Sequence, residues 1–488
     1  MYKEIRQRAS VPQRYEQQVI NEGVISASYA TQFRKDRASF LQKELDQSTS
    51  YQPISEWDMG QERGVVRGKW SDMVWPMSPA AIHNPETGIT KDILMKVGEA
   101  SVKAPDSFNV HERLKRHIGA RLKSLESGSS INWGTAEALA FGSLMLEGHD
   151  VRISGQDVGR GTFSHRHAML VDQITEEVVV PLNESLTGGR LELANSSLSE
   201  FAVLGFEYGM SWESPNLLPI WEAQFGDFFN GAQVIIDTFV SSSETKWAMQ
   251  SGLVMLLPHG LDGAGPEHSS MRIERMLQLT NDPYAPQAGA NVNMSIANPT
   301  TAAQYFHLLR RQMKRNFRKP LIIAAPKGLL RSPAASSKME DFLPSTSFRA
   351  VLPDLEAATS QVRRILLVSG KLYYDLVKER SSRNLDKEIA IIRMEELCPF
   401  PFFALRDALE PYLAHSASAE VTWVQEEAQN QGAWTHVMPR LQSLFEEMGW
   451  DKRVKYVGRP VSEVPAVGVA KMHSAQLSKF MEDAFHGV

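Results

Sequence analysis

Residues 252–275 read Gly-Leu-Val-Met-Leu-Leu-Pro-His-Gly-Leu-Asp-Gly-Ala-Gly-Pro-Glu-His-Ser-Ser-Met-Arg-Ile-Glu-Arg. The stretch runs from a continuous apolar segment, 253–257, into a glycine-rich loop. A continuous apolar run is typical of a parallel-sheet strand that is covered on both faces. Pro258 lacks a backbone N–H, so we expect the strand to end there. Ligands of open α/β sheets bind outside the carboxyl ends of the strands, which makes this loop a candidate site.

Two histidines, His259 and His268, lie in this loop. A loop histidine is more often a hydrogen-bonded structural residue than a ligand, so neither indicates a site by itself. The three glycines between them allow the backbone to pass close to a bound molecule. Ser269 and Ser270 are expected to cap the helix that follows.

The composition limits the class of protein. The chain has 488 residues, 42% of them apolar, which is enough for about two or three domains with ordinary cores. Its net charge of −5 gives no basic surface that would favour nucleic acid. No apolar run approaches the roughly 20 residues needed to cross a membrane. Cys398 is the only cysteine, which excludes an intrachain disulfide and a cysteine-based metal cluster.

Predicted strands and helices alternate in two successive regions, a pattern that indicates α/β domains with parallel sheets covered by helices. The first set lies within residues 126–335 and the second within residues 361–488. Residues 336–360 are expected to link them. Residues 1–125 are expected to form a helical or irregular connector. The strands are expected at 151–154, 217–221, 253–257, 292–296, 321–325, 365–368, 389–393, 421–425 and 454–457.

A second loop is expected at the same edge of the first sheet. Residues 154–167 contain three glycines and two histidines, together with Gln156 and Asp157. A solvated polar loop would explain the charged residues. It would not explain so many glycines and histidines together, so the segment is a candidate part of a site.

Two further segments are expected there. Residues 195–201 place Glu200 at a helix start, where a carboxylate can simply favour the positive end of the helix dipole. Residues 220–230 place Phe225 and Phe228 just after a strand, where both could equally be core aromatics.

Together these segments resemble the C-terminal half of the thiamine-diphosphate-dependent E1 components of 2-oxo acid dehydrogenase complexes, especially the 2-oxoglutarate dehydrogenase group. The resemblance covers nearly the whole chain and rests on Ser-Gly-Gln-Asp-Val-Gly-Arg-Gly, Leu-Ser-Glu, Trp-Glu-Ala-Gln-Phe-Gly-Asp-Phe, Leu-Leu-Pro-His-Gly and Gly-Pro-Glu-His-Ser-Ser. Gly-Phe-Glu-Tyr-Gly and Phe-Phe-Asn-Gly-Ala-Gln are more similar to the 2-oxoadipate branch. It implies a transketolase-like pyrimidine-binding domain over residues 126–335 and a smaller transketolase C-terminal-like domain over residues 361–488.

The resemblance also implies a role for each candidate residue. Glu200 matches the glutamate that shares a proton with ring atom N1′ of thiamine diphosphate. Phe228 matches the aromatic residue that stacks on this pyrimidine ring, with Phe225 beside it. His268 matches an active-site histidine near the reacting carbonyl, where it can stabilise charge and move protons. His259 is a second catalytic candidate.

Gln156 and Asp157 are expected to form part of the wall beside the pyrimidine. In relatives the diphosphate is held through Mg²⁺ or Ca²⁺, hard cations that need oxygen ligands. Those ligands come from a Gly-Asp-Gly segment and a later Asn, and no Gly-Asp-Gly occurs in this sequence. We therefore expect thiamine diphosphate as cofactor, no metal ligands in this chain, an N-terminal diphosphate-binding domain outside it, and no turnover by the chain alone.

The implied reaction is oxidative decarboxylation of a 2-oxo dicarboxylic acid, 2-oxoglutarate or 2-oxoadipate, with transfer of the acyl group to a lipoyl-bearing E2 subunit. The resemblance further implies a homodimer or a pairing with the N-terminal half. It also implies a mitochondrial location, although the sequence has no clear transit peptide. An alternative is a non-catalytic fragment or assembly module that keeps the fold without binding the cofactor. A transketolase or a separate β-type E1 subunit is a third hypothesis.

Overall fold

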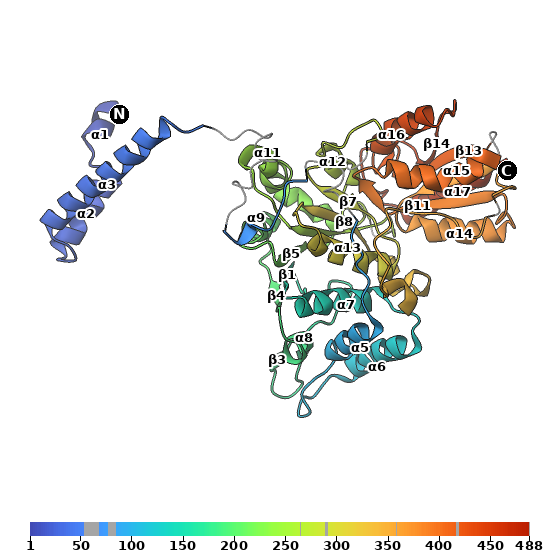
Figure 1. Ribbon diagram of the computed structural model, residues 1–488, viewed down its shortest axis with the longest axis horizontal. Helices are drawn as coiled ribbons and strands as arrows, with labels where there is room; N and C mark the ends of the chain where they lie inside the picture. The colour runs from blue at the N-terminus through green and yellow to red at the C-terminus, as the bar shows by residue number, and fades with distance from the viewer. Residues whose placement is uncertain are drawn as a thin grey trace. The chain divides into compact units, whose positions relative to one another are not determined.

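The computed structural model describes residues 1–52, 68–76, 84–263, 265–287, 291–357, 359–415 and 419–487. The chain divides into two compact units, residues 1–59 and 60–488. The larger unit contains a seven-stranded and a five-stranded sheet with helices packed around them (Figure 1). It also has a two-stranded antiparallel sheet formed by β2 (Leu170–Val171) and β3 (Val178–Val179).

The smaller unit consists of helices whose starts are capped by serine. The Ser10 hydroxyl accepts a hydrogen bond from the Gln13 N–H, and the Ser26 hydroxyl accepts one from the Tyr29 N–H. Among the described residues of this unit only Ala30 is buried, so its helices have almost no core of their own. The helices are α1 (Tyr2–Gln7), α2 (Val11–Asn21) and α3 (Ala27–Ser48).

The first sheet of the larger unit has seven strands in the order β12-β7-β8-β6-β5-β1-β4. All neighbours are parallel except β12, which pairs antiparallel with β7. The central strand β6 is buried at every position, as expected when helices cover both faces of a sheet. The strands are β1 (Asp150–Gly155), β4 (Leu191–Asn195), β5 (Leu217–Glu222), β6 (Val254–His259), β7 (Ser295–Ala297), β8 (Leu321–Pro326) and β12 (Glu396–Cys398).

Helix α7 is buried along most of its length between the sheet and other helices. Figure 1 shows α5 and α6 beside it, and Leu94, Val97 and Leu125 from these two helices belong to the same hydrophobic core as α7. The expected connector, residues 1–125, therefore contributes helices to this core. The helices of this domain are α5 (Lys91–Ala100), α6 (Glu112–Ser127), α7 (Trp133–Leu146), α8 (Pro181–Ser185), α9 (Glu200–Met210), α10 (Gln233–Ile235), α11 (Ser243–Trp247), α12 (Ile273–Gln278) and α13 (Ala302–Lys314).

The second sheet has the order β14-β13-β10-β11-β9, with only β9 antiparallel to its neighbour among the strands of this sheet. A single hydrophobic core joins the two sheets, since Met255 of β6 and Trp423 of β13 belong to one cluster of buried residues. The predicted α/β class with parallel sheets is confirmed. The elements are β9 (Val351–Leu352), β10 (Arg364–Val368), α14 (Leu372–Ser382), β11 (Ile389–Met394), α15 (Phe402–His415), β13 (Glu420–Ala428), α16 (Trp434–Glu447), β14 (Lys455–Arg459) and α17 (Ala470–Phe485).

The prediction that Pro258 ends its strand is wrong. Strand β6 continues through Pro258 to His259, and both residues pair with β8. The pairing of β6 with β5 ends at Leu256, so beyond that residue β6 has a neighbour on one side only. A proline is tolerated at such an edge because fewer backbone N–H groups are needed there.

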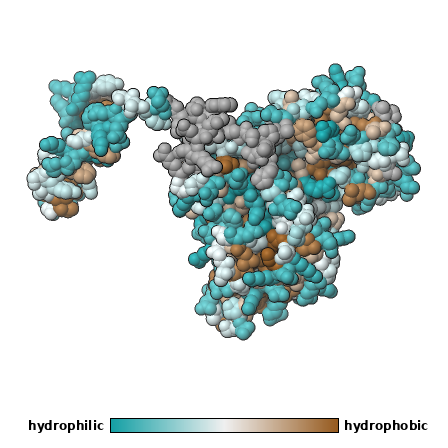
Figure 2. Space-filling model, in the orientation of Figure 1, coloured by the Kyte–Doolittle hydropathy of each residue, from teal (hydrophilic) through white to brown (hydrophobic). Residues whose placement is uncertain are grey.

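Figure 2 shows hydrophilic side chains over much of the visible face of the larger unit, with hydrophobic residues gathered near its middle.

A buried ion pair ties β12 to α13. Arg311 donates from Nη2 and Nη1 to the two carboxylate oxygens of Glu396, at 2.5 and 3.2 Å. The two side chains are only 4% and 5% exposed. We call the part of the larger unit around the first sheet the first domain and the part around the second sheet the second domain. Because Glu396 directly follows β11 of the second sheet in sequence, this pair joins the second domain to the first.

Replacing Glu396 with alanine should destabilise the larger unit by about 3–5 kcal/mol, because Arg311 would stay buried without its carboxylate. The shift can be measured as the midpoint of urea unfolding followed by tryptophan fluorescence. Glu112→Ala is the matched control, since it breaks an exposed pair with Lys115 and should leave the midpoint near that of the wild type. Equal midpoints for the two variants would contradict a stabilising role for the buried pair.

Candidate active site

Four loops meet at the carboxyl edge of the first sheet, because β6, β5, β1 and β4 are neighbours in it. The loop after β6 carries His268, and the segment after β5 carries Phe225 and Phe228. The loop after β1 carries Gln156 and Asp157. The predicted site residues on these strands therefore lie at one edge, where ligands of such sheets bind.

His268 lies in a cluster of aromatic rings. Its ring centroid is 4.4 Å from that of Phe225 and 5.7 Å from that of Phe228, in edge-to-face arrangements. Phe163, from the loop after β1, packs edge-on against Phe225 at 5.8 Å. His268 is half-buried, so one side of the imidazole is held by rings while the other stays accessible. Three candidate residues from two separate segments thus contact one another.

Glu200 is the first residue of α9, and its neighbour Ser199 caps the helix by accepting a hydrogen bond from the Ala202 N–H at 3.3 Å. Glu200 itself is half-buried. Its Oε2 lies 3.5 Å from the point where a Cβ on Gly231 would stand. Gly231 belongs to the short 3₁₀ helix η3 (Gly226–Ala232), which also carries Phe228. The carboxylate and the aromatic ring therefore come from adjoining elements.

Asp227 holds the turn that follows His268. Its Oδ1 accepts hydrogen bonds from the Ser269 N–H at 3.2 Å and the Ser270 N–H at 3.1 Å. The expectation that these serines cap α12 is wrong, because Arg272 precedes that helix in a left-handed conformation without a side-chain cap. The Ser269 hydroxyl instead donates to the Gly265 carbonyl, and the Ser270 hydroxyl accepts from the Arg272 N–H. The serine hydroxyls thus stabilise the loop rather than the helix.

His259 is buried and bonded at both ring nitrogens. The Met271 N–H donates to Nδ1 at 3.2 Å, so Nε2 is the nitrogen that donates to Glu427 Oε1 at 2.7 Å. Burial lowers the pKa of His259, but the Glu427 carboxylate outweighs this and raises the pKa overall. With both nitrogens engaged, the geometry favours a positioning role for His259 over contact with a substrate.

The loop after β1 is supported differently at its two predicted residues. The Gln156 carbonyl accepts a hydrogen bond from Gln224 Nε2 at 2.9 Å, which ties this loop to the segment after β5. Asp157 adopts a left-handed conformation with φ of 54°. Its side chain is 64% exposed and pairs with Arg160 at 3.4 Å.

A buried network of charged and polar side chains holds the base of the same loop. The sequence analysis did not predict this network. Arg166 donates to Glu137 at 2.5 Å and to Glu222 at 2.9 Å, and the Tyr305 hydroxyl donates to Glu137 at 2.7 Å. Burial raises the pKa of Glu137, but Arg166 lowers it more, so the carboxylate stays charged. The network fixes the loop to α7, β5 and α13.

Comparisons with known proteins agree with this geometry. Residues 129–333 match the transketolase pyrimidine-binding domain, and residues 336–485 match the 2-oxoglutarate dehydrogenase C-terminal domain. The 2-oxoadipate dehydrogenase complex component E1 of Xenopus laevis is 49% identical over 98% of this chain, and that of Danio rerio is 48% identical over 99%. The 2-oxoglutarate dehydrogenase E1 component of Brucella canis is 42% identical over 99%. The chain thus contains a transketolase-type pyrimidine-binding domain and a 2-oxoglutarate dehydrogenase C-terminal domain.

The chain spans about half the length of these E1 relatives, namely 50%, 51% and 47% of the Xenopus, Danio and Brucella proteins. The resemblance inferred from the sequence motifs is confirmed by these matches. Among the described residues, no helix combines the length and the apolar character needed to cross a membrane.

The residues of this E1 site fit the pyrimidine side of thiamine diphosphate. Phe225 and Phe228 offer apolar ring surfaces, and Glu200 places a carboxylate beside Gly231, where the missing side chain leaves space. In the part of the chain that the structure describes, no group of three or more His, Cys, Asp or Glu side chains is arranged to hold a metal ion.

Lys327 is a site residue that the sequence-based prediction missed. It follows β8, and its Nζ donates to the His268 carbonyl at 2.6 Å and lies 5.9 Å from the Phe225 ring centroid. The sequence feature that could have indicated Lys327 was its position directly after a predicted strand of the same sheet. A lysine in a loop has no spacing that distinguishes it, so only the packing identifies it.

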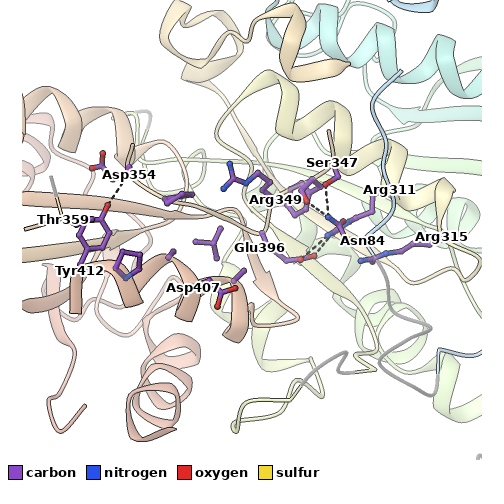
Figure 3. A pocket seen from close by; sticks show the side chains of 17 residues that line it. Asn84, Arg311, Arg315, Ser347, Arg349, Asp354, Thr359, Glu396, Asp407 and Tyr412 are labelled. Carbon is purple, nitrogen blue, oxygen red and sulfur yellow. Dashed lines mark hydrogen bonds and ion pairs between the residues drawn. The ribbon is translucent and has the colours of Figure 1, made fainter. Parts of the chain in front are cut away.

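A separate cavity of about 690 Å³ lies between the two domains of the larger unit. Figure 3 shows Arg311, Arg315 and Asn84 on one side of it and Asp354 and Tyr412 on the other. Burial, together with neighbouring Arg311, lowers the pKa of Arg315 to about 9. The described residues that line the cavity include none of the predicted E1 site residues, so it is distinct from the candidate active site.

His167, at the end of the loop after β1, should make stability depend on pH. Its ring lies 4.6 Å from that of His117, and burial followed by the charge of His117 lowers its pKa to about 4. The unfolded chain takes up this proton near pH 6.5, well before the folded protein does. The stabilisation is therefore present in full above pH 6.5 and is lost as the pH falls toward 4.

His167→Asn should flatten the loss of thermal stability between pH 6.5 and pH 4, because asparagine does not titrate and tolerates the left-handed φ of 47°. Melting temperatures measured at half-unit pH steps give the slope. His415→Asn, at an exposed position, serves as the control and should keep the wild-type slope. A His167→Asn slope equal to that of the wild type would exclude this histidine as a source of acid sensitivity.

Proposed function

We propose that this chain forms the pyrimidine-binding half of the active site of a 2-oxo acid dehydrogenase E1. The enzyme would oxidatively decarboxylate 2-oxoadipate or 2-oxoglutarate and transfer the acyl group to a lipoyl-bearing E2 subunit. The observation that carries the proposal is the convergence of Glu200, Phe228 and His268 at one sheet edge in a chain whose relatives are E1 components.

Each residue in this proposal performs a distinct task. When bound, thiamine diphosphate supplies the carbon nucleophile that attacks the 2-oxo group and accepts the electrons released with CO₂. Glu200 holds the proton shared with ring atom N1′, and Phe228 supports the ring face with Phe225 beside it. His268 holds or moves a proton at the substrate carbonyl, a task typically worth about 10²- to 10⁴-fold in rate.

The 2-oxoadipate branch is the better-supported choice of substrate. The seven E1 relatives named for 2-oxoadipate are 44–49% identical to this chain, against 42% for the Brucella 2-oxoglutarate E1. The motifs Gly-Phe-Glu-Tyr-Gly and Phe-Phe-Asn-Gly-Ala-Gln point the same way. By analogy with the family, we propose a mitochondrial location and a homodimeric assembly or a pairing with a diphosphate-binding half.

We propose that Mg²⁺ and its oxygen ligands belong to a diphosphate-binding domain equivalent to the half of the relatives that this chain does not cover. Gln156 and Asp157 would stand beside the pyrimidine at the edge of the composite site. The alternative is an assembly module that keeps the fold without binding the cofactor, and cofactor binding separates the two.

The chain alone should bind thiamine diphosphate weakly and without tightening by Mg²⁺, because its sequence lacks the Gly-Asp-Gly segment expected to supply cation ligands. Isothermal titration with the chain alone, and then with a diphosphate-binding domain of a relative added as a separate polypeptide, measures this. Mg²⁺-dependent binding and decarboxylation should appear only in the mixture. Tight, metal-dependent binding by the chain alone would contradict the composite site, and no binding in either case would favour the assembly module.

In the reconstituted complex, Glu200→Gln should slow exchange of the cofactor C2 proton by at least about 10²-fold, because a neutral amide cannot share the N1′ proton. Proton NMR of the bound cofactor in deuterated buffer measures the rate. Glu213→Gln, an exposed glutamate beyond the end of α9, is the control and should exchange like the wild type. An unchanged rate for Glu200→Gln would leave this residue with its role at the helix start alone.

A further inference from the structure

The glycine-rich loop that carries His268 is held by charged side chains that the proposed function does not use. Asp262 lies near the start of the loop. Its Oδ1 is 3.3 Å from Lys371 Nζ, and its Oδ2 is 3.4 Å from Lys327 Nζ. Lys327 follows β8 of the first domain, whereas Lys371 immediately precedes α14 of the second. One carboxylate in the loop therefore pairs with a lysine from each domain.

The second domain holds the start of the loop through a pair of adjacent glutamates. Glu426 pairs with Lys371 at 2.8 Å and accepts a hydrogen bond from the Leu261 N–H at 3.2 Å. Glu427 bonds His259 at 2.7 Å, and the other nitrogen of that ring accepts from the Met271 N–H. Both glutamates are buried. The two ends of the loop are thus fastened to the same strand, β13.

Gly260 allows this arrangement. Its φ of 140° lies in the region that favours glycine, and a Cβ at this position would stand 2.9 Å from Cε of Lys371. The lysine side chain consequently lies directly against the loop backbone. Any larger residue at this position would push Lys371 away from Asp262.

Lys327 completes the connection to His268. The side chain is only 7% exposed, and its Nζ bridges Asp262 and the His268 carbonyl. The same ammonium group lies over the Phe225 ring, on which His268 also packs. Lys327 therefore contacts the backbone of His268 directly and its ring through Phe225.

We propose that Asp262, Lys327, Lys371, Glu426 and Glu427 form a loop clamp through which the second domain positions His268 against Phe225. The clamp residues are positioning residues. The catalytic role of His268 rests on the proposed function. The clamp itself concerns only how rigidly the loop is held. Buried charges suit this role because a buried charge that loses its partner of opposite charge is costly. The loop therefore has a single arrangement in which all these charges are paired. A catalytic side chain must be held this closely, since small misplacements lower the rate.

The clamp can be tested in the chain as it exists, without cofactor, by hydrogen exchange with mass spectrometry. Lys371→Met should speed amide exchange in peptides covering residues 259–271 by roughly tenfold to a hundredfold, as expected when hydrogen bonds to charged groups are lost. Exchange in β8 should stay as in the wild type. The matched control is Lys378→Met, an exposed lysine on the same helix α14, which should leave the loop unchanged.

Asp262→Asn provides a second variant that does not depend on a buried lysine, because the Asp262 side chain is one-third exposed (33%). It should speed exchange in the same peptides, and it decides the matter if Lys371→Met does not fold. Lys327→Arg keeps the charge and should restore most of the protection that Lys327→Met loses. Wild-type exchange of the loop in both Lys371→Met and Asp262→Asn would overturn the clamp.

A reconstituted complex separates the clamp from the proposed function. Lys327→Met should lower turnover by about tenfold or more and slow C2-proton exchange by less than it slows turnover, because Glu200 is untouched while the contact with the His268 backbone is lost. If Glu200→Gln also left exchange unchanged, the proposed function would fail while the hydrogen-exchange result would still decide the clamp. If Lys327→Met slowed C2 exchange as much as turnover, a specific effect on His268 would be excluded.

Discussion

The buried strand β6 is the constraint on which the rest of the larger unit depends. It is covered on both faces, pairs with β5 and β8, and belongs with the second sheet to one hydrophobic core. Because its backbone is satisfied by its neighbours, the strand can deliver a glycine-rich loop to a defined point at the carboxyl edge. The segment after β5 arrives beside it for the same reason. The proximity of His268 to Phe225 and Phe228 follows from strand order.

The second domain takes part in the site through charge as well as apolar contact. Its strand β12 extends the first sheet, and Arg311 and Glu396 close that junction with a buried ion pair. Glu426 and Glu427 reach the histidine loop from β13. Buried pairs of this kind add little net stability but strongly disfavour other arrangements, because an unpaired buried charge is costly. These pairs therefore determine how the two domains are positioned relative to each other.

The described candidate residues gather on one side of the proposed site. Aromatic rings, a half-buried carboxylate and an accessible imidazole gather at one edge of the sheet. In the proposed function these groups face a flat heteroaromatic ring that exchanges a proton, while the diphosphate and its cation are held elsewhere. The division agrees with a chain that covers about half the length of its E1 relatives. A composite active site is the simplest arrangement that unites these observations.

The sequence by itself determined the α/β class, the positions of most strands and the family, because buried parallel strands leave continuous apolar runs and the site loops leave long motifs. It also placed Phe228 and His268 after strands and Glu200 at a helix start, on segments that the strand rule brings to one edge. Only the tertiary structure decided that β6 runs through Pro258, that Ser269 and Ser270 do not cap a helix, and that β12 crosses to the first sheet. The same holds for Lys327 and the other clamp residues. A lysine–carboxylate pair between distant segments has no spacing in the chain, since it exists only when packing excludes water from both charges.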